Sequence, residues 1–125
     1  MALRISSMVL RICGLLALIL GLIFWIAGIK GALVPVHMLL GLLIAIALWV
    51  EGGVIATAKG GNIGLGIAAF VIGVLLIWLG LTQASLMVGS SHWIIQVLHL
   101  LLGLIAISLG EAITGIYRKR VRKAL

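Results

Sequence analysis

The sequence predicts an all-α integral membrane protein, a bundle of four transmembrane helices that forms a single domain over residues 1–125. Its composition is 65% hydrophobic and only 9% charged, which is more apolar than any soluble globular domain requires. The apolar residues also fall into four separate stretches, and a helix needs about 20 apolar residues to cross a bilayer. These stretches span residues 8–29, 33–57, 63–86 and 92–117.

The positive charges are sorted to one side of this bundle. If successive helices alternate in direction, Lys30 alone falls on one side and the other eight lysines and arginines fall on the opposite side. The positive-inside rule then places both termini in the cytoplasm, and we expect a prokaryotic cytoplasmic membrane. Residues 118–125 are predicted to be a basic cytoplasmic tail that anchors to lipid headgroups. Because the charge of +7 is sorted in this way, it favours lipid as a partner and argues against nucleic acid.

The chain is interpreted as a duplicated helical hairpin, with one repeat over 8–57 and the other over 63–117. The second and fourth stretches share a histidine followed four residues later by glycine. Because both hairpins start on the same side, they would be parallel repeats, with the second and fourth helices as equivalent partners. Close helix packing in lipid explains the glycines without any ligand. Glycine recurs every seven residues in the first and third stretches, as Gly14, Gly21 and Gly28 and as Gly66, Gly73 and Gly80.

Two histidines are candidate metal ligands. His37 is followed by Gly41 in the second stretch, and His99 by Gly103 in the fourth. Low-spin haem iron binds two imidazole nitrogens, and helix bundles supply them from facing helices. A glycine one turn from each histidine leaves room for a flat porphyrin. The sequence therefore predicts one bis-histidine haem b, with His37 and His99 as the ligands and Gly41 and Gly103 beside it.

Other interpretations of the histidines remain open at this stage. Both can serve as hydrogen-bonding groups between helices, and a single histidine can bind the magnesium of a bacteriochlorophyll. His37 lies near the end of its helix and His99 is deeper in its own, so a shared haem requires tilt or a shift between the helices. The propionates would point toward Lys30 and the segment 90–92, where His92 is expected near the surface.

The two acidic residues form a second candidate site with one arginine. Glu51 and Glu111 precede the basic border by seven or eight residues, and Arg11 reaches a similar depth. We expect the three to form a buried charge cluster in which Arg11 pairs with one carboxylate, because unpaired charge in the membrane is costly. The other carboxyl would be protonated, hydrogen-bonded or shared. The cluster is either a structural device that fixes helix register or a site for protons or a quinone.

Histidines on the second and fourth of four helices, each with a nearby glycine, resemble those of small membrane b-type cytochromes. The resemblance implies an electron-transfer subunit with one haem at His37 and His99, working with a quinone or within a larger respiratory or photosynthetic complex. Such a chain is not expected to be an enzyme alone, and no motif of a soluble enzyme is present. The alternatives are a small proton-coupled carrier using Glu51 and Glu111, and a non-catalytic accessory or pigment-binding subunit.

Overall fold

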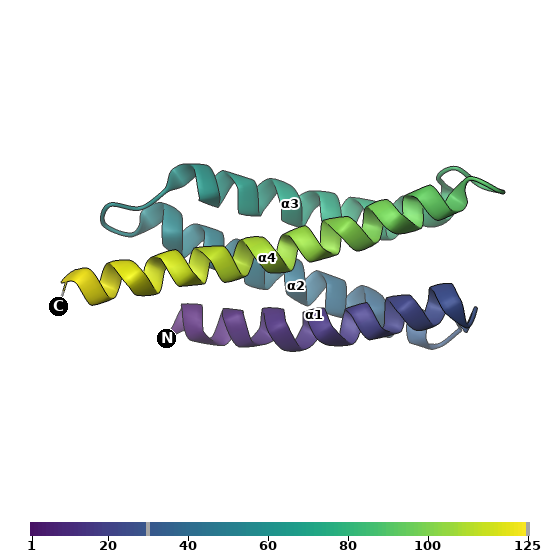
Figure 1. Cartoon of the computed structure of the whole chain (residues 1–125), viewed down its shortest axis with the longest axis horizontal. Coiled ribbons are helices and arrows are strands. Elements are labelled where there is room, and N and C mark those ends of the chain that lie inside the picture. Colours follow the sequence, from purple (N-terminus) through teal and green to yellow (C-terminus); the bar gives the residue numbers. More distant parts are fainter. Residues whose placement is uncertain (30, 125) are drawn as a thin grey trace.

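The protein is an all-helical bundle, seen in a computed structural model that describes residues 1–29 and 31–124. Consecutive helices run in opposite directions, so both termini lie at the same end of the bundle (Figure 1). Four helices are long and apolar enough to cross a membrane, which confirms the predicted class at this level. They are α1 (Ala2–Ile26), α2 (Leu33–Thr57), α3 (Ile63–Thr82) and α4 (His92–Ala124), with the short 3₁₀ turn η1 (Gln83–Ser85) after α3.

Glycine and asparagine set the helix ends. α1 ends at Ile26, before Gly28, whose φ of +67° suits glycine and interrupts a helix. α3 begins after Asn62, whose side chain accepts a hydrogen bond from the backbone N–H of Leu65 at 3.1 Å. This is the usual role of asparagine as a helix N-cap. The turn before it contains Gly60, also at a φ of +67°.

The basic segment differs from the predicted tail, because α4 continues through it to Ala124. No glycine or proline follows Gly115, and lysine and arginine are good helix formers. Arg122 and Lys123 lie in the last turn, where cations stabilise the helix dipole. Arg120 donates a hydrogen bond to the carbonyl of Gly60, so the extension also contacts the α2–α3 turn.

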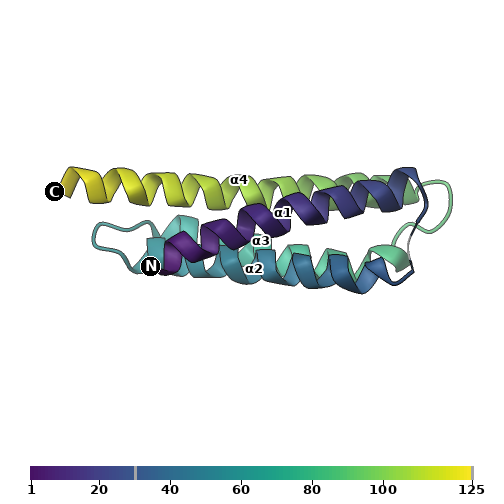
Figure 2. The same ribbon diagram turned by 90° about the horizontal axis from the view of Figure 1, so that it is seen from below.

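The four helices form a bundle in which each contacts its two neighbours, and α2 and α4 also contact each other through the centre. α2 and α4 run in the same direction and contact each other, while α1 and α3 lie on either side of them (Figure 2). Within the described part of the chain, α1 and α3 do not contact each other. Side chains on α2 and α4 therefore meet at the centre of the bundle.

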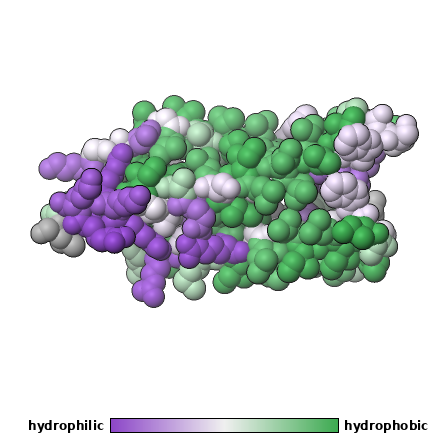
Figure 3. Space-filling view, in the orientation of Figure 1, coloured by the Kyte–Doolittle hydropathy of each residue, from purple (hydrophilic) through white to green (hydrophobic). Residues whose placement is uncertain are grey.

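The interior and the surface are both apolar, as expected where lipid replaces water. Leu10, Leu48, Ile55 and Ile113 are fully buried. Figure 3 shows hydrophobic side chains over most of one face and hydrophilic ones gathered toward the end that carries the C-terminus. Tryptophan side chains are exposed at the opposite end, at Trp25, Trp78 and Trp93. Such a belt is typical of a membrane interface.

The contact between α2 and α3 depends on small residues. A Cβ added at Gly52 would lie 2.6 Å from the Cβ of Ala69, and one added at Gly66 would lie 2.7 Å from the Cβ of Ala56. Neither position has room for a side chain. Close approach of this kind is what holds helices together in lipid, where hydrophobicity gives no preference for one helix over another.

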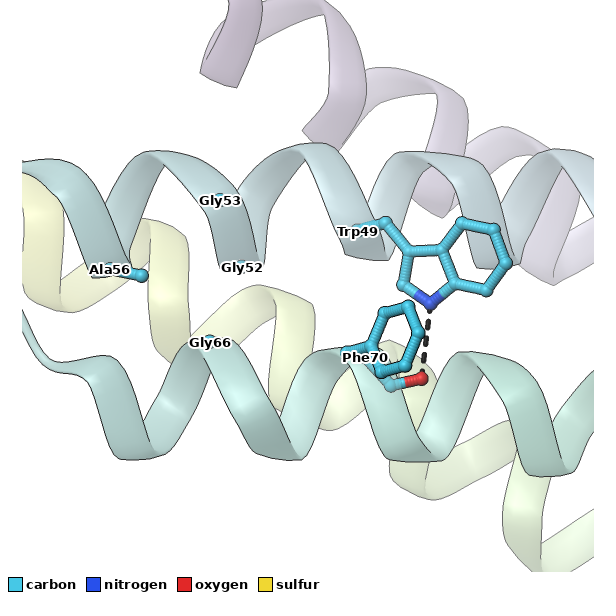
Figure 4. A pocket seen from close by; sticks show the side chains of 6 residues that line it. All are labelled: Trp49, Gly52, Gly53, Ala56, Gly66 and Phe70. Atoms are coloured by element: carbon cyan, nitrogen blue, oxygen red, sulfur yellow. Dashed lines mark hydrogen bonds between the residues drawn. The ribbon is translucent and has the colours of Figure 1, made fainter.

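Trp49 extends this contact toward the middle of the membrane. Its indole N–H donates to the backbone carbonyl of Phe70 at 3.1 Å (Figure 4). A shallow hollow of about 190 Å³ lies beside it, lined by Trp49, Gly52, Gly53, Ala56, Gly66 and Phe70. Ligand pockets usually measure about 300–1,000 Å³, so this hollow is better understood as a packing feature than as a cofactor site.

The adjacent glycines Gly52 and Gly53 test this packing. Gly52→Ala places a methyl group against Ala69, and overpacking of this kind costs about 1–3 kcal/mol. Gly53→Ala meets nothing within 4 Å and gains up to about 1 kcal/mol in helix propensity. We expect the first variant to unfold at lower temperature than the wild type in detergent, and the second at the same or higher temperature. Equal effects of the two alanines would contradict the proposed contact.

Candidate functional site

The two predicted ligand histidines meet across the diagonal of the bundle. His37 of α2 and His99 of α4 have ring centroids 6.1 Å apart, with an angle of 54° between the ring planes. His37 lies on the second turn of its helix and His99 on the third. The sequence indicated that His99 lies deeper in its helix than His37. The way in which α2 packs against α4 nevertheless brings the two rings together.

Each histidine packs against a glycine of a flanking helix. A Cβ added at Gly21 of α1 would lie 3.4 Å from Cε1 of His37, and one added at Gly80 of α3 would lie 3.6 Å from Cε1 of His99. Phe24 adds an edge-on contact to His37, with ring centroids 5.4 Å apart. The glycines of α1 and α3 thus leave space in which the imidazoles of α2 and α4 lie.

One ring nitrogen of each histidine is buried without a hydrogen-bond partner. Nδ1 of His37 and Nδ1 of His99 are both buried without a partner, although buried polar atoms are paired in the great majority of cases. The predicted spacer glycines face open space, because a Cβ added at Gly41 or Gly103 meets nothing within 4 Å.

The residues expected near the haem propionates lie in or beside the α3–α4 connection, apart from Lys30. His92 begins α4, and its Nδ1 lies 3.1 Å from the carbonyl oxygen of Leu86, so it contacts the α3–α4 connection. Lys30, the predicted cation at this end, lies outside the described residues. Ser90 and Ser91 are exposed in the same connection.

Arg11 and Glu111 form an ion pair between α1 and α4. Nε of Arg11 lies 2.6 Å from Oε1 of Glu111, and an Nη lies 2.8 Å from Oε2. Such a two-point contact is the strongest geometry for this pair. The two side chains are 50% and 39% exposed, so they lie on the outer surface of the bundle. The predicted pairing of Arg11 with one carboxylate is thus present, and of the three side chains Glu51 is the buried one.

Glu51 alone of the three is buried, at 0% exposure. Neither carboxyl oxygen has a hydrogen-bond partner. The neighbouring hydroxyls come from Ser6 of α1 and Thr114 of α4, which are also buried. The physical reason for separating Glu51 from the ion pair is helix geometry. Residues next to each other on a helix differ by about 100°, so Gly110 faces Glu51 while Glu111 points outward.

Sequence reasoning missed several side chains of these sites. It noted Gly21 and Gly80 as parts of a stripe without assigning their partners, and it gave no role to Ser6 or Trp49. A signal existed for Ser6 and Ser7, because two adjacent serines interrupt an otherwise apolar helix. Comparison with protein-family models, curated protein sequences and solved structures finds no significant match to this chain.

The ion pair between Arg11 and Glu111 can be tested by exchanging its charges. Arg11→Glu places two carboxylates together and Glu111→Arg places two guanidiniums together, so each single variant should lower the unfolding midpoint in detergent. The double variant restores an opposite pair and should recover more than half of the loss. The midpoint is read from circular dichroism. If the midpoint of the double variant falls by the sum of the two single decreases, the two side chains do not interact.

Proposed function

We propose that the protein is a b-type cytochrome-like electron-transfer subunit that holds one haem between α2 and α4, with His37 and His99 as axial ligands. One observation carries this proposal. Two imidazoles from different membrane-spanning helices face each other at 6.1 Å between ring centroids, and both have an unpaired buried nitrogen.

The separation suits one metal ion between the rings. Metal–imidazole bonds of about 2 Å on each side, plus about 1 Å from each nitrogen to its ring centre, give about 6 Å between centroids. Two histidines alone are too few ligands for a bare ion, and no group of three or more His, Cys, Asp or Glu side chains occurs within the described residues. An iron porphyrin supplies its own four equatorial nitrogens and needs only the two axial ligands.

The surrounding glycines support a flat cofactor. Gly41 and Gly103 leave open space on the ligand helices, and Gly21 and Gly80 let the imidazoles lie close to the backbones of the flanking helices. When bound, a haem with both axial positions filled by imidazole supplies one-electron transfer rather than oxygen chemistry. The two histidines would fix its position, and the apolar helices would exclude water from it.

The proposal extends to topology and partners. The two hairpins would be parallel repeats with both termini in the cytoplasm. The gathering of hydrophilic side chains at the end that carries the C-terminus supports this topology (Figure 3), as does the run of basic residues over 118–123. Between its helices the chain has short connections only, so we place the redox partner elsewhere. It would be a membrane quinone or another subunit of a respiratory or photosynthetic complex.

The carrier hypothesis finds less support. An alternating carrier needs carboxyls that release and bind ions, but both oxygens of Glu111 are bonded to Arg11. Glu51 is fully buried, and no second acidic side chain of the described residues is free to take part in exchange with it. A pigment-binding subunit remains distinguishable from a cytochrome by its spectrum.

Visible spectroscopy tests the axial ligands. The purified wild type should show a sharp α-band on reduction, typical of bis-histidine haem b, and His37→Ala or His99→Ala should abolish it. His92→Ala is the matched control and should retain the band, because His92 contacts the loop. A folded but colourless wild type after expression with adequate haem would contradict the proposal. A chlorophyll-type spectrum would instead show that the protein is a pigment-binding subunit.

The space beside the histidines gives a second test, with a control on the same helix. Gly103→Phe fills the volume one turn from His99, whereas Gly115→Phe puts the same ring at another open position of α4. We expect Gly103→Phe to lose most of its haem, measured per folded protein, and Gly115→Phe to keep it. Equal haem content in both variants would show that the cofactor does not use this space.

A further inference from the structure

A second polar site lies at the other end of α2. Glu51 is fully buried, and both carboxyl oxygens lack a hydrogen-bond partner. It follows His37 by fourteen residues, which is about 21 Å along a helix at ~1.5 Å per residue. The site is therefore separate from the proposed haem, and inferences about it do not depend on that haem.

Helices α1 and α4 enclose this carboxyl of α2. The hydroxyls of Ser6 on α1 and Thr114 on α4 lie beside it. Gly110 of α4 lies directly against it, since a Cβ added there would be 2.7 Å from Oε2 of Glu51. Ser6 and Thr114 are 6% and 2% exposed, and Oγ1 of Thr114 also has no partner. The enclosure is thus polar inside and closed to lipid.

Hydrogen-bond donors are scarce in this enclosure. A hydroxyl has one hydrogen to donate, and that of Ser6 goes to the carbonyl of Leu3 at 3.3 Å. Thr114 therefore offers the one hydroxyl hydrogen that is not already used. An ionised carboxylate accepts about four hydrogen bonds, so the site cannot satisfy a charged Glu51.

The nearby charges do not supply what is missing. The positive charge of Arg11 on α1 acts on Glu51, but its guanidinium makes two hydrogen bonds to Glu111. Glu111 of α4 adds a second negative charge, and α3 contains no titratable side chain over Ile63–Thr82. A buried carboxylate without a partner is costly, and a bound proton removes that cost.

We propose that Glu51, Ser6 and Thr114 form a proton-binding site, in which the carboxyl is protonated at neutral pH and exchanges its proton with water at the end of the bundle that carries the termini. The bound proton gives Glu51 a donor, and the hydroxyl oxygens of Ser6 and Thr114 are available to accept it. Release leaves the carboxylate and returns one proton to water. Glu51 lies six residues before the end of α2 at Thr57, about 9 Å at ~1.5 Å per residue, so that end is the nearer one.

A proton fits this site better than a metal cation does. Hard cations such as calcium and magnesium take about six or more oxygen ligands. The three side chains offer four oxygens, and the fully buried Leu10 fills space nearby, in contact with the position of Gly110. The room that additional ligands would need is therefore occupied by an apolar side chain.

Infrared spectroscopy of the full chain in lipid vesicles tests the proposal directly. A protonated carboxyl absorbs at higher frequency than a carboxylate, and the sequence contains two acidic side chains, so assignment is simple. At neutral pH we expect a protonated-carboxyl band that shifts in D₂O, disappears in Glu51→Gln and persists in Glu111→Gln, the matched control. If Glu51→Gln does not fold, Glu51→Asp should still move the band.

Three results would overturn the proposal. Absence of the band in the wild type at neutral pH would show an ionised Glu51. A band that never shifts in D₂O would show a locked structural proton. Loss of the band when choline is replaced by sodium would show a metal-cation site. The measurement needs no haem, so a colourless protein would leave the test of Glu51 intact.

Discussion

The close approach of helices at glycine is the constraint on which both candidate sites depend. Lipid does not drive apolar helices together as water does, so association in the membrane rests on tight packing and on hydrogen bonds between helices. In this bundle glycine serves both needs. Gly52 and Gly66 bring α2 and α3 together backbone to backbone, whereas Gly21, Gly80 and Gly110 each provide the space for a polar side chain of α2 or α4. Replacing the glycines would therefore displace the polar groups as well as the helices.

This arrangement makes α2 the central element of the protein. Like α4, it contacts all three other helices, and its contacts with α1 and α3 are the most extensive in the bundle. It carries His37 near one end and Glu51 near the other. An ionisable group in the membrane is tolerated when it faces the bundle interior, and α2 is the helix with the most interior to face. Every helix, α2 included, also exposes apolar side chains on the outer surface. Two separate polar sites can therefore share one small apolar bundle without bringing their charges together.

Features that depend on a single helix could be predicted from the sequence, whereas contacts between helices could not. The lengths of the apolar stretches predicted the four helices. The shared histidine–glycine spacing singled out His37 and His99 as a pair, and their rings lie together in the structure. The sequence did not reveal that α1 covers Glu51 with Ser6, or that Arg11 and Glu111 lie on the outer surface. Helical periodicity gives the angle of a side chain around its own axis, but the partner at that angle is set by packing between helices. The helical extension beyond residue 117 was missed because its charges were interpreted as a tail.

The glycine contacts also qualify the proposed duplication. If the first and third helices are aligned by their glycines, Gly21 corresponds to Gly73 and Gly28 to Gly80. The histidines do not follow that alignment, because His37 packs against Gly21 and His99 packs against Gly80. In the second hairpin, the histidine therefore contacts a glycine seven residues further along its partner helix than in the first hairpin. Seven residues return a helix to within about 20° of the same face, so a stripe of glycines every seven residues offers equivalent positions along its length. Two imidazoles can then meet at one level even though their hairpins differ in length.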